Sequence, residues 1–87
     1  MRPKNPIHPG KILLEEFLNP LKLSQRRFAQ NIGWTPARLS DLVTGKRGIT
    51  ADSALDLART LGTSPELWMN LQVYWDLQRA EERRRAS

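Results

Sequence analysis

Signals that start and stop helices recur so closely along this chain that they leave room only for short helices. A hydroxyl residue or a proline marks each expected start, and a glycine or an Asn–Pro pair marks most of the ends. Between these signals the apolar residues recur three or four positions apart, and no stretch alternates as a half-buried strand does. The sequence therefore predicts an all-α fold of five helices. The expected helices lie at residues 9–18, 24–32, 36–43, 50–61 and 65–80.

Length and composition fit one small soluble domain. The 87 residues can bury a single modest core, and the hydrophobic share of 39% and charged share of 26% are ordinary for a globular protein. We expect one domain over residues 1–80, followed by a polar tail, residues 81–87, that frays. No apolar run approaches the ~18 residues of a membrane span. The first residues lack the apolar stretch of a signal peptide, so we expect a cytoplasmic protein without membrane contact.

The sequence contains no recognisable catalytic or metal-binding set. It has no cysteine and one histidine, His8, which has no acid at ligand spacing nearby, so we expect no metal site and no cofactor. His8 is better interpreted as the residue at which the first helix begins. Glu15 and Glu16 are adjacent, so they point about 100° apart on a helix and cannot form a facing acid–base pair. We therefore expect a binding protein rather than an enzyme.

Positive charge is concentrated in one stretch of the chain. Residues 22–47 carry six basic side chains and one acid, whereas residues 48–82 carry two basic side chains and six acids. The formal net charge of +5 thus understates a cationic surface near the middle of the chain. Such a surface attracts polyanions, nucleic acid first among them. A solvated face of lysines and arginines is the alternative interpretation.

The cationic stretch coincides with a helix-turn-helix pattern whose core spans residues 23–48. The expected helices at 24–32 and 36–43, joined by a tight glycine turn, match this motif in length and spacing. In the motif the second helix enters the major groove of DNA and the first crosses the phosphate backbone. A purely structural helical bundle, acting as a protein-interaction module without DNA contact, is the alternative. The coincidence with positive charge favours DNA binding.

The outward-facing residues of the two helices have the chemistry that DNA contact requires. Arg38 is long enough for two hydrogen bonds to a guanine edge, and Ser24 and Gln25 lie where a helix N-terminus can bind a phosphate. Lys46 and Arg47, just past the second helix, are expected to neutralise flanking phosphates. The predicted DNA-binding residues are Ser24, Gln25, Thr35, Ala37, Arg38, Ser40, Asp41, Lys46 and Arg47.

The last expected helix, residues 65–80, carries more large apolar side chains than the end of a small domain requires. Trp68 lies seven residues before Trp75 on the same face, and we expect it in the core. The excess predicts a dimer interface that includes Leu71, Tyr74 and Trp75. A cofactor pocket is the weaker alternative. The tail arginines, 83–85, are typical of a solvated tail, although they are long enough to touch DNA.

Five sequence motifs resemble the HigA (VapI-like) addiction-module antitoxins, which belong to the Cro/C1-type helix-turn-helix family. The motifs are His8-Pro9-Gly10-Lys11-Ile12-Leu13, Leu23-Ser24-Gln25, Gly45-Lys46-Arg47-Gly48-Ile49-Thr50-Ala51, Gly62-Thr63-Ser64-Pro65-Glu66-Leu67-Trp68 and Asn70-Leu71-Gln72. The resemblance covers residues 8–80. It implies a lambda-repressor-like fold and a homodimer that binds a palindromic operator in its own promoter. It also implies a partner toxin of the HigB kind, a small RelE-fold ribonuclease that cleaves mRNA.

The resemblance also assigns roles, and the sequence departs from the family pattern at two positions. Gln25, Thr35, Arg38 and Ser40 match the family's DNA-facing positions. Lys11 stands where an acid is common, and Trp34 occupies a turn position where a smaller apolar residue is usual. Trp34 either packs on the DNA backbone or covers the core. A stand-alone regulator without a toxin, such as a phage-like or restriction-controller repressor, is the alternative within the same chemistry.

Overall fold

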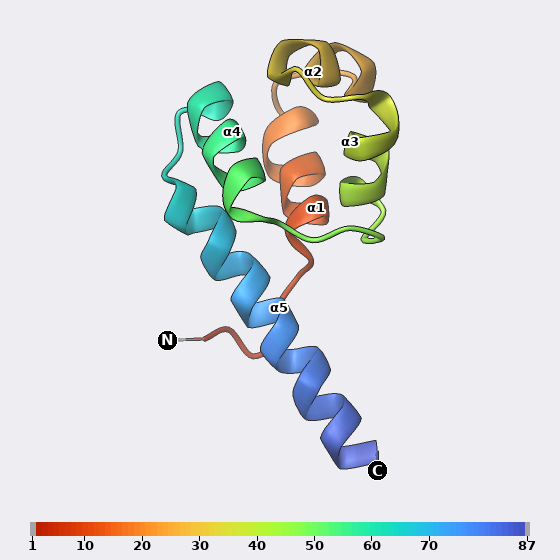
Figure 1. Ribbon diagram of the computed structural model, residues 1–87, viewed down its shortest axis with the longest axis vertical. Helices are drawn as coiled ribbons and strands as arrows, with labels where there is room; N and C mark the ends of the chain where they lie inside the picture. Colours follow the sequence, from red (N-terminus) through yellow and green to blue (C-terminus); the bar gives the residue numbers. More distant parts are fainter. Residues whose placement is uncertain (1, 87) are drawn as a thin grey trace.

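The structure is a computed structural model that describes residues 2–86, and every regular element in that range is a helix (Figure 1). The elements are α1 (Pro9–Ile12), its π-helical continuation η1 (Leu13–Leu18), α2 (Gln25–Ile32), α3 (Pro36–Val43), α4 (Ala51–Leu61) and α5 (Pro65–Ala86). Because η1 continues α1 directly, the two form one helix, and the prediction of a five-helix, all-α fold is confirmed. No helix in residues 2–86 is long and apolar enough to cross a bilayer.

Side-chain caps set the starts of four helices. In each case a hydroxyl oxygen accepts a hydrogen bond from the backbone N–H three residues later, which satisfies one of the unpaired donors of the first turn. The capping residues are Ser24, Thr35, Thr50 and Ser64. Gly33 and Gly62 follow α2 and α4 in the left-handed conformation, with φ of 83° and 73°. Local sequence therefore determines these helix ends.

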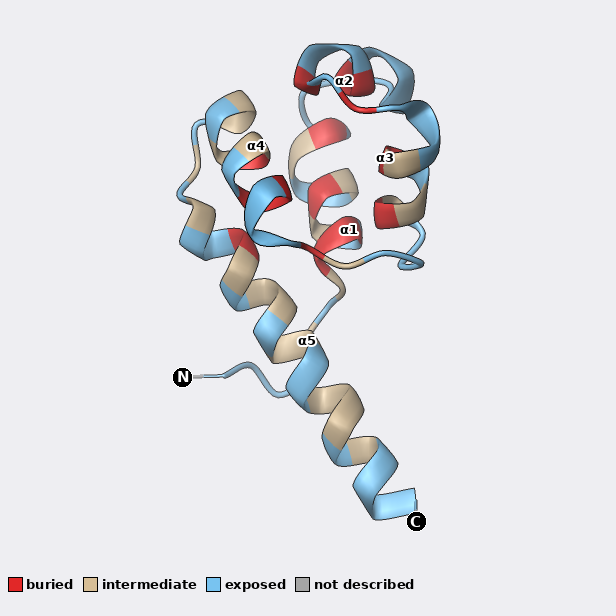
Figure 2. Cartoon of the chain, in the orientation of Figure 1, coloured by how far each residue is buried: buried red, intermediate tan, exposed pale blue. Residues whose placement is uncertain are grey.

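The core lies where the first four helices meet the beginning of α5 (Figure 2). Trp68 on α5 is fully buried, as predicted; its ring centroid lies 5.3 Å from that of Phe17, and its indole N–H donates to the Thr63 hydroxyl at 2.8 Å. The other members of the buried hydrophobic cluster are Leu13, Leu18, Phe28, Ala29, Ile32, Trp34, Leu39, Leu42, Ile49, Ala54 and Leu57. This core holds the α2–α3 pair in place.

Gly10 allows the first helix to pack directly on α3. A side-chain carbon at this position would overlap the carbonyl group of Leu42. The backbones of α1 and α3 therefore approach more closely than any larger residue would permit. His8 begins the helix, as predicted: its Nδ1 accepts a hydrogen bond from the Gly10 N–H at 2.9 Å.

Helix α5 is longer than the sequence predicts, and its second half projects beyond the other helices (Figure 1). The predicted helix end at residue 80 is wrong, because residues 81–86, expected as a polar tail, are helical; Ser87 lies outside the described residues. Local ion pairing explains the extension: Arg79 contacts Glu82 at 2.8 Å, and Arg2 from the N-terminal arm contacts Glu81 at 3.0 Å. Three arginines in the last turn also complement the helix dipole.

Candidate nucleic-acid interface

Helices α2 and α3 form a helix-turn-helix. Gly33 ends α2, the Trp34 backbone N–H donates to the Ala29 carbonyl at 3.0 Å, and Thr35 caps α3, so the turn between the helices is short. The buried residues of both helices are apolar and lie on the side that faces the other helices, whereas the opposite side is exposed (Figure 2). The geometry of this pair suits a helix placed in the major groove of DNA.

Most of the predicted DNA-binding residues are exposed on this pair and on the loop that follows it. Seven of them are exposed, whereas Arg38 and Asp41 are partly covered by other side chains. The exposed residues are Ser24, Gln25, Thr35, Ala37, Ser40, Lys46 and Arg47. The Ser24 and Thr35 oxygens accept backbone N–H groups as caps, and each hydroxyl proton stays available to donate to a phosphate.

The basic loop after α3 is tied to the end of that helix. The backbone N–H groups of Lys46 and Arg47 both donate to the Asp41 carbonyl, at 2.8 and 3.1 Å. The Arg47 guanidinium also lies 3.8 Å from the Asp41 carboxylate. Gly45 permits this reversal because its φ is 81°. Asp41 therefore partly offsets the charge of Arg47 and orients it, which the sequence did not predict.

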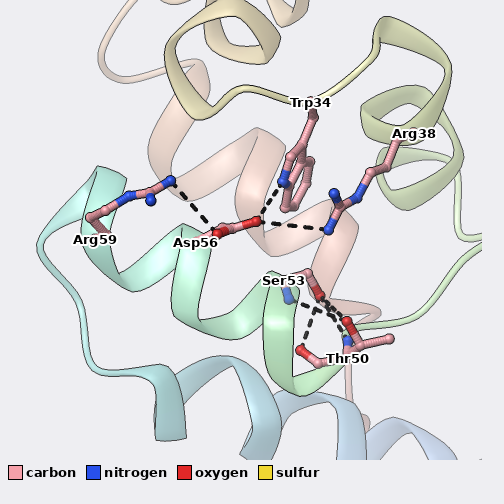
Figure 3. A network of polar contacts seen from close by, with 6 residues as sticks. All are labelled: Trp34, Arg38, Thr50, Ser53, Asp56 and Arg59. Carbon is pink, nitrogen blue, oxygen red and sulfur yellow. Dashed lines mark hydrogen bonds and ion pairs between the residues drawn. The ribbon is translucent and has the colours of Figure 1, made fainter.

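Arg38 does not stand free on the outer face of α3, which corrects the expectation. It precedes Leu42 by four residues, so it lies at the edge of the buried side, and 32% of its side chain is exposed. Its guanidinium carbon lies 4.2 Å from the centroid of the Trp34 ring, and its Nη2 lies 3.9 Å from the Asp56 carboxylate on α4 (Figure 3). Asp56 was not predicted as part of the site, because no local sequence pattern connects it to α3.

Trp34 covers the core, which resolves its two alternative interpretations. Only 7% of it is exposed, and its indole N–H donates to Asp56 Oδ2 at 2.9 Å. The other carboxylate oxygen of Asp56 faces Arg59 at 3.6 Å (Figure 3). The large indole in the turn therefore serves as a platform under Arg38 and as a donor that fixes the Asp56 carboxylate.

The contacts that hold Arg38 are weak enough for DNA to compete with them. A partly exposed ion pair contributes ~0–1 kcal/mol, and a cation–π contact at an exposed site ~0.5–1 kcal/mol. A two-bond contact of arginine to guanine contributes ~1–3 kcal/mol to discrimination between bases. The Trp34 and Asp56 contacts thus restrict the conformations of free Arg38 without preventing it from reaching a base.

Helix α5 has apolar side chains that its own chain leaves exposed. Val73 and Leu77 are 46% and 45% exposed, and neither is among the predicted dimerisation residues. Of the predicted dimerisation residues, Leu71 packs partly against the core and Tyr74 is half-buried. Trp75 makes contacts within the chain: its ring meets that of His8 edge-on at 5.3 Å and lies 4.2 Å from the Arg79 guanidinium carbon.

Burial of His8 beside Trp75 lowers the pKa of its imidazole, and the nearby Asp76 carboxylate opposes this shift. The neutral form leaves Nδ1 free to accept the Gly10 N–H and so to cap the first helix. In the part of the chain that the structure describes, no three potential metal ligands cluster together.

Comparison with known proteins places this geometry in a family. Residues 14–68 match the helix-turn-helix family. Virulence-associated protein I of Dichelobacter nodosus is 45% identical over 76 residues, which cover 87% of this chain and 70% of that protein. Antitoxin HigA-1 of Vibrio cholerae serotype O1 is 35% identical, over 85% of this chain and 70% of that protein.

A solved structure agrees with these sequence relatives. The structure of Pseudomonas aeruginosa antitoxin HigA with the higBA promoter superposes with a TM-score of 0.83 at 41% identity, covering 87% of this chain and 83% of that one. Both the fold and the sequence thus lead to the same group of proteins. The chain belongs to the HigA (VapI-like) family of helix-turn-helix proteins.

Proposed function

We propose that this protein is an antitoxin that binds operator DNA and represses transcription of its own operon. The observation that carries this proposal is the helix-turn-helix, on and beside which seven predicted contact residues are exposed. The relationship to HigA, an antitoxin solved with promoter DNA, supports it. Such a protein acts by binding rather than by catalysis, and in the cytoplasm, where the operon lies.

In this proposal α3 enters the major groove and α2 lies across the phosphate backbone. Ser24 and Gln25, at the start of α2, bind a phosphate through short polar groups and the helix N-terminus. Arg38 and Ser40 meet base edges. The exposed loop residues Lys46 and Arg47 neutralise flanking phosphates and contribute affinity without sequence preference. Ala37 and Thr35 lie close enough to the same groove to contact bases or backbone, and Asp41 orients Arg47.

A second copy of the chain is the proposed occupant of the apolar side of α5. Leu67, Leu71 and Tyr74 lie at positions i, i+4 and i+7, so they share one side of the helix, and Leu77 is one turn beyond Tyr74. Leu67 is 37% exposed and Leu77 45%. A homodimer through this side covers them and relates two α3 helices by a two-fold axis. Two such helices about 34 Å apart read a palindrome.

Arg38→Ala tests the assignment of the reading residue. The variant is expected to lose ~1–3 kcal/mol of preference for operator over scrambled duplex, because it removes the two-bond contact to guanine. Gel shifts with both duplexes measure this preference. Arg83→Ala, near the C-terminal end of α5 and far from the α2–α3 pair, is the matched control and is expected to keep this preference (Figure 1). Equal preference in Arg38→Ala and the unmodified protein would show that another residue reads the bases.

The proposed partner is a HigB-like ribonuclease of the RelE fold, and family membership supports it. Lys11, which departs from the family pattern, is exposed and lies 4.0 Å from Glu15 on the same helix. We expect the product of the neighbouring gene to co-purify with this chain and to stop growth when expressed alone. A neighbouring product that neither binds this chain nor arrests growth would instead indicate a stand-alone regulator.

A further inference from the structure

We propose that Asp56 of α4 is a positioning residue for DNA recognition. It holds the Arg38 guanidinium on the Trp34 ring, in the place from which Arg38 reaches a base, although Asp56 itself does not contact DNA. The inference rests on the proposed function, because it takes Arg38 as a residue that reads bases. It adds a residue outside the helix-turn-helix to the determinants of sequence preference.

Three segments meet at this contact: the turn before α3 contributes Trp34, α3 contributes Arg38, and α4 contributes Asp56 (Figure 3). Asp56 Oδ2 accepts the Trp34 indole N–H at 2.9 Å and faces Arg38 Nη2 at 3.9 Å, while Oδ1 faces Arg59 Nη2 at 3.6 Å. Trp34 is anchored in the core with 7% exposure. The carboxylate is therefore held by a rigid donor and cannot turn freely away from Arg38.

Ring and carboxylate constrain Arg38 in complementary ways. The face of the Trp34 ring, 4.2 Å from the guanidinium carbon, fixes the plane of the fork. The carboxylate attracts one end of the fork and so selects its rotation within that plane. Because a guanidinium has five N–H donors, the remaining donors stay free for a base edge. An arginine ordered before binding loses less conformational freedom when it forms the two-bond contact.

The negative charge of Asp56 allows a positioning role to be distinguished from a general electrostatic effect on DNA affinity. An acid beside a DNA-binding surface repels phosphates, so removing its charge favours binding to any sequence. Removing the carboxylate that positions Arg38 instead lowers the preference for one sequence over another. We therefore expect Asp56→Asn to bind scrambled duplex as tightly as the unmodified protein or more tightly, and to discriminate less between sequences.

The experiment measures discrimination as the ratio of dissociation constants for scrambled and selected duplexes. The selected duplex is the tightest-binding one recovered by the unmodified protein from a randomised library. Asp56→Asn is expected to lower the ratio about fivefold, within the range that loss of an arginine–guanine contact spans. The matched control is Asp52→Asn, which removes one negative charge from the exposed first turn of the same helix and is expected to change both constants alike.

A double-mutant cycle with Arg38→Ala links the effect to its cause. If Asp56 acts through Arg38, Asp56→Asn lowers the ratio in the unmodified protein and leaves it unchanged in the Arg38→Ala background. The same fall in both backgrounds, or no fall in either while Arg38→Ala alone lowers the ratio, would overturn the inference and leave the proposed function standing. No discrimination by the unmodified protein would overturn both.

A second variant guards against loss of folding. Asparagine at position 56 keeps an oxygen that accepts the Trp34 indole N–H, and thermal midpoints by circular dichroism show whether each variant is folded at the assay temperature. Trp34→Phe keeps an aromatic platform and removes the N–H that orients Asp56. It is expected to lower the ratio about twofold, less than Asp56→Asn, and an unchanged ratio in both folded variants contradicts the inference.

Discussion

The helical hairpin formed by α2 and α3 differs from helix α5 in the chemistry of its exposed surface. In the hairpin, Phe28, Ile32, Leu39 and Leu42 are buried (Figure 2), and the exposed residues are mostly polar or charged, with Pro36 and Ala37 among the exceptions. Among the residues that the structure describes, α5 buries only Trp68, although it is 22 residues long and carries several large apolar side chains. The exposed surface of the hairpin is therefore mostly polar, whereas that of α5 includes large apolar side chains.

This difference supports a different proposed partner for each region. A surface of hydroxyls, amides and cations loses little by exposure and binds an anionic polymer through charge and hydrogen bonds. Exposed apolar side chains gain free energy when another apolar surface covers them. The hairpin thus fits DNA, and the far part of α5 fits a second protein chain. Four substitutions test the comparison, from the largest expected effect to the smallest.

The largest effect is expected from Trp68, which joins α5 to the core that supports the hairpin. Trp68→Ala removes a fully buried ring and the indole hydrogen bond to Thr63, and is expected to cost ~3–5 kcal/mol of unfolding free energy. Urea denaturation followed by circular dichroism measures the loss. Trp75→Ala, in the half-exposed part of the same helix, is expected to cost about 1 kcal/mol. Equal losses would show that the two halves of α5 do not differ in role.

The next effect concerns the apolar side of α5. Tyr74→Asp places a carboxylate among Leu71 and Leu77 and is expected to raise the dissociation constant of the dimer at least about tenfold, because burying a charge in an apolar interface is costly. Analytical ultracentrifugation measures the change. The control is Arg83→Asp, which places the same carboxylate at an exposed position about 180° from Tyr74 around the helix. A dimer that tolerates Tyr74→Asp would place the interface elsewhere.

Features of the molecule that depend on neighbouring residues could be predicted from the sequence. Ser24 and Thr35 cap helices and Gly33 ends one, because each acts on backbone within a few residues of itself. Residues 81–86 were misassigned because they lack the apolar periodicity that marks a helix packed on a core. Their helix is stabilised instead by contacts among charged side chains, such as Arg79 with Glu82.

The candidate site was predictable in outline and not in its contacts. The exposed positions of α3 follow from helical spacing around Leu39 and Leu42. The environment of Arg38 does not, because it depends on Asp56, which is 18 positions further along the chain and reaches Arg38 only through the packing of α4. The role of Trp34 stayed open for the same reason, since its indole partner is also Asp56.

A smaller effect tests whether the hairpin side meets phosphates. Lys46→Ala removes one exposed cation next to α3 and is expected to weaken binding to operator and scrambled duplex alike. The slope of log K against log salt concentration should become shallower by about 0.9 per protomer, since one phosphate contact fewer releases its counterion. Lys11→Ala, which removes a lysine from α1, is the control and should leave the slope unchanged. A change confined to one duplex would instead make Lys46 a reading residue.

The smallest expected effect is on the pH dependence of stability. It tests the contact of His8, at the start of α1, with Trp75 on α5. Burial lowers the pKa of His8, so between the folded-state pKa and its ordinary value of 6.5 the unfolded chain binds more protons than the folded chain. The contribution of neutral His8 to the free energy of unfolding is therefore fully present above pH 6.5, and it falls as the pH decreases through this window. His8→Asn keeps a side chain that can cap the first helix and removes the titratable imidazole. Thermal midpoints at about pH 7.5 and about pH 5.5 should differ less in this variant than in the unmodified protein, and an equal difference would assign the pH dependence to another group.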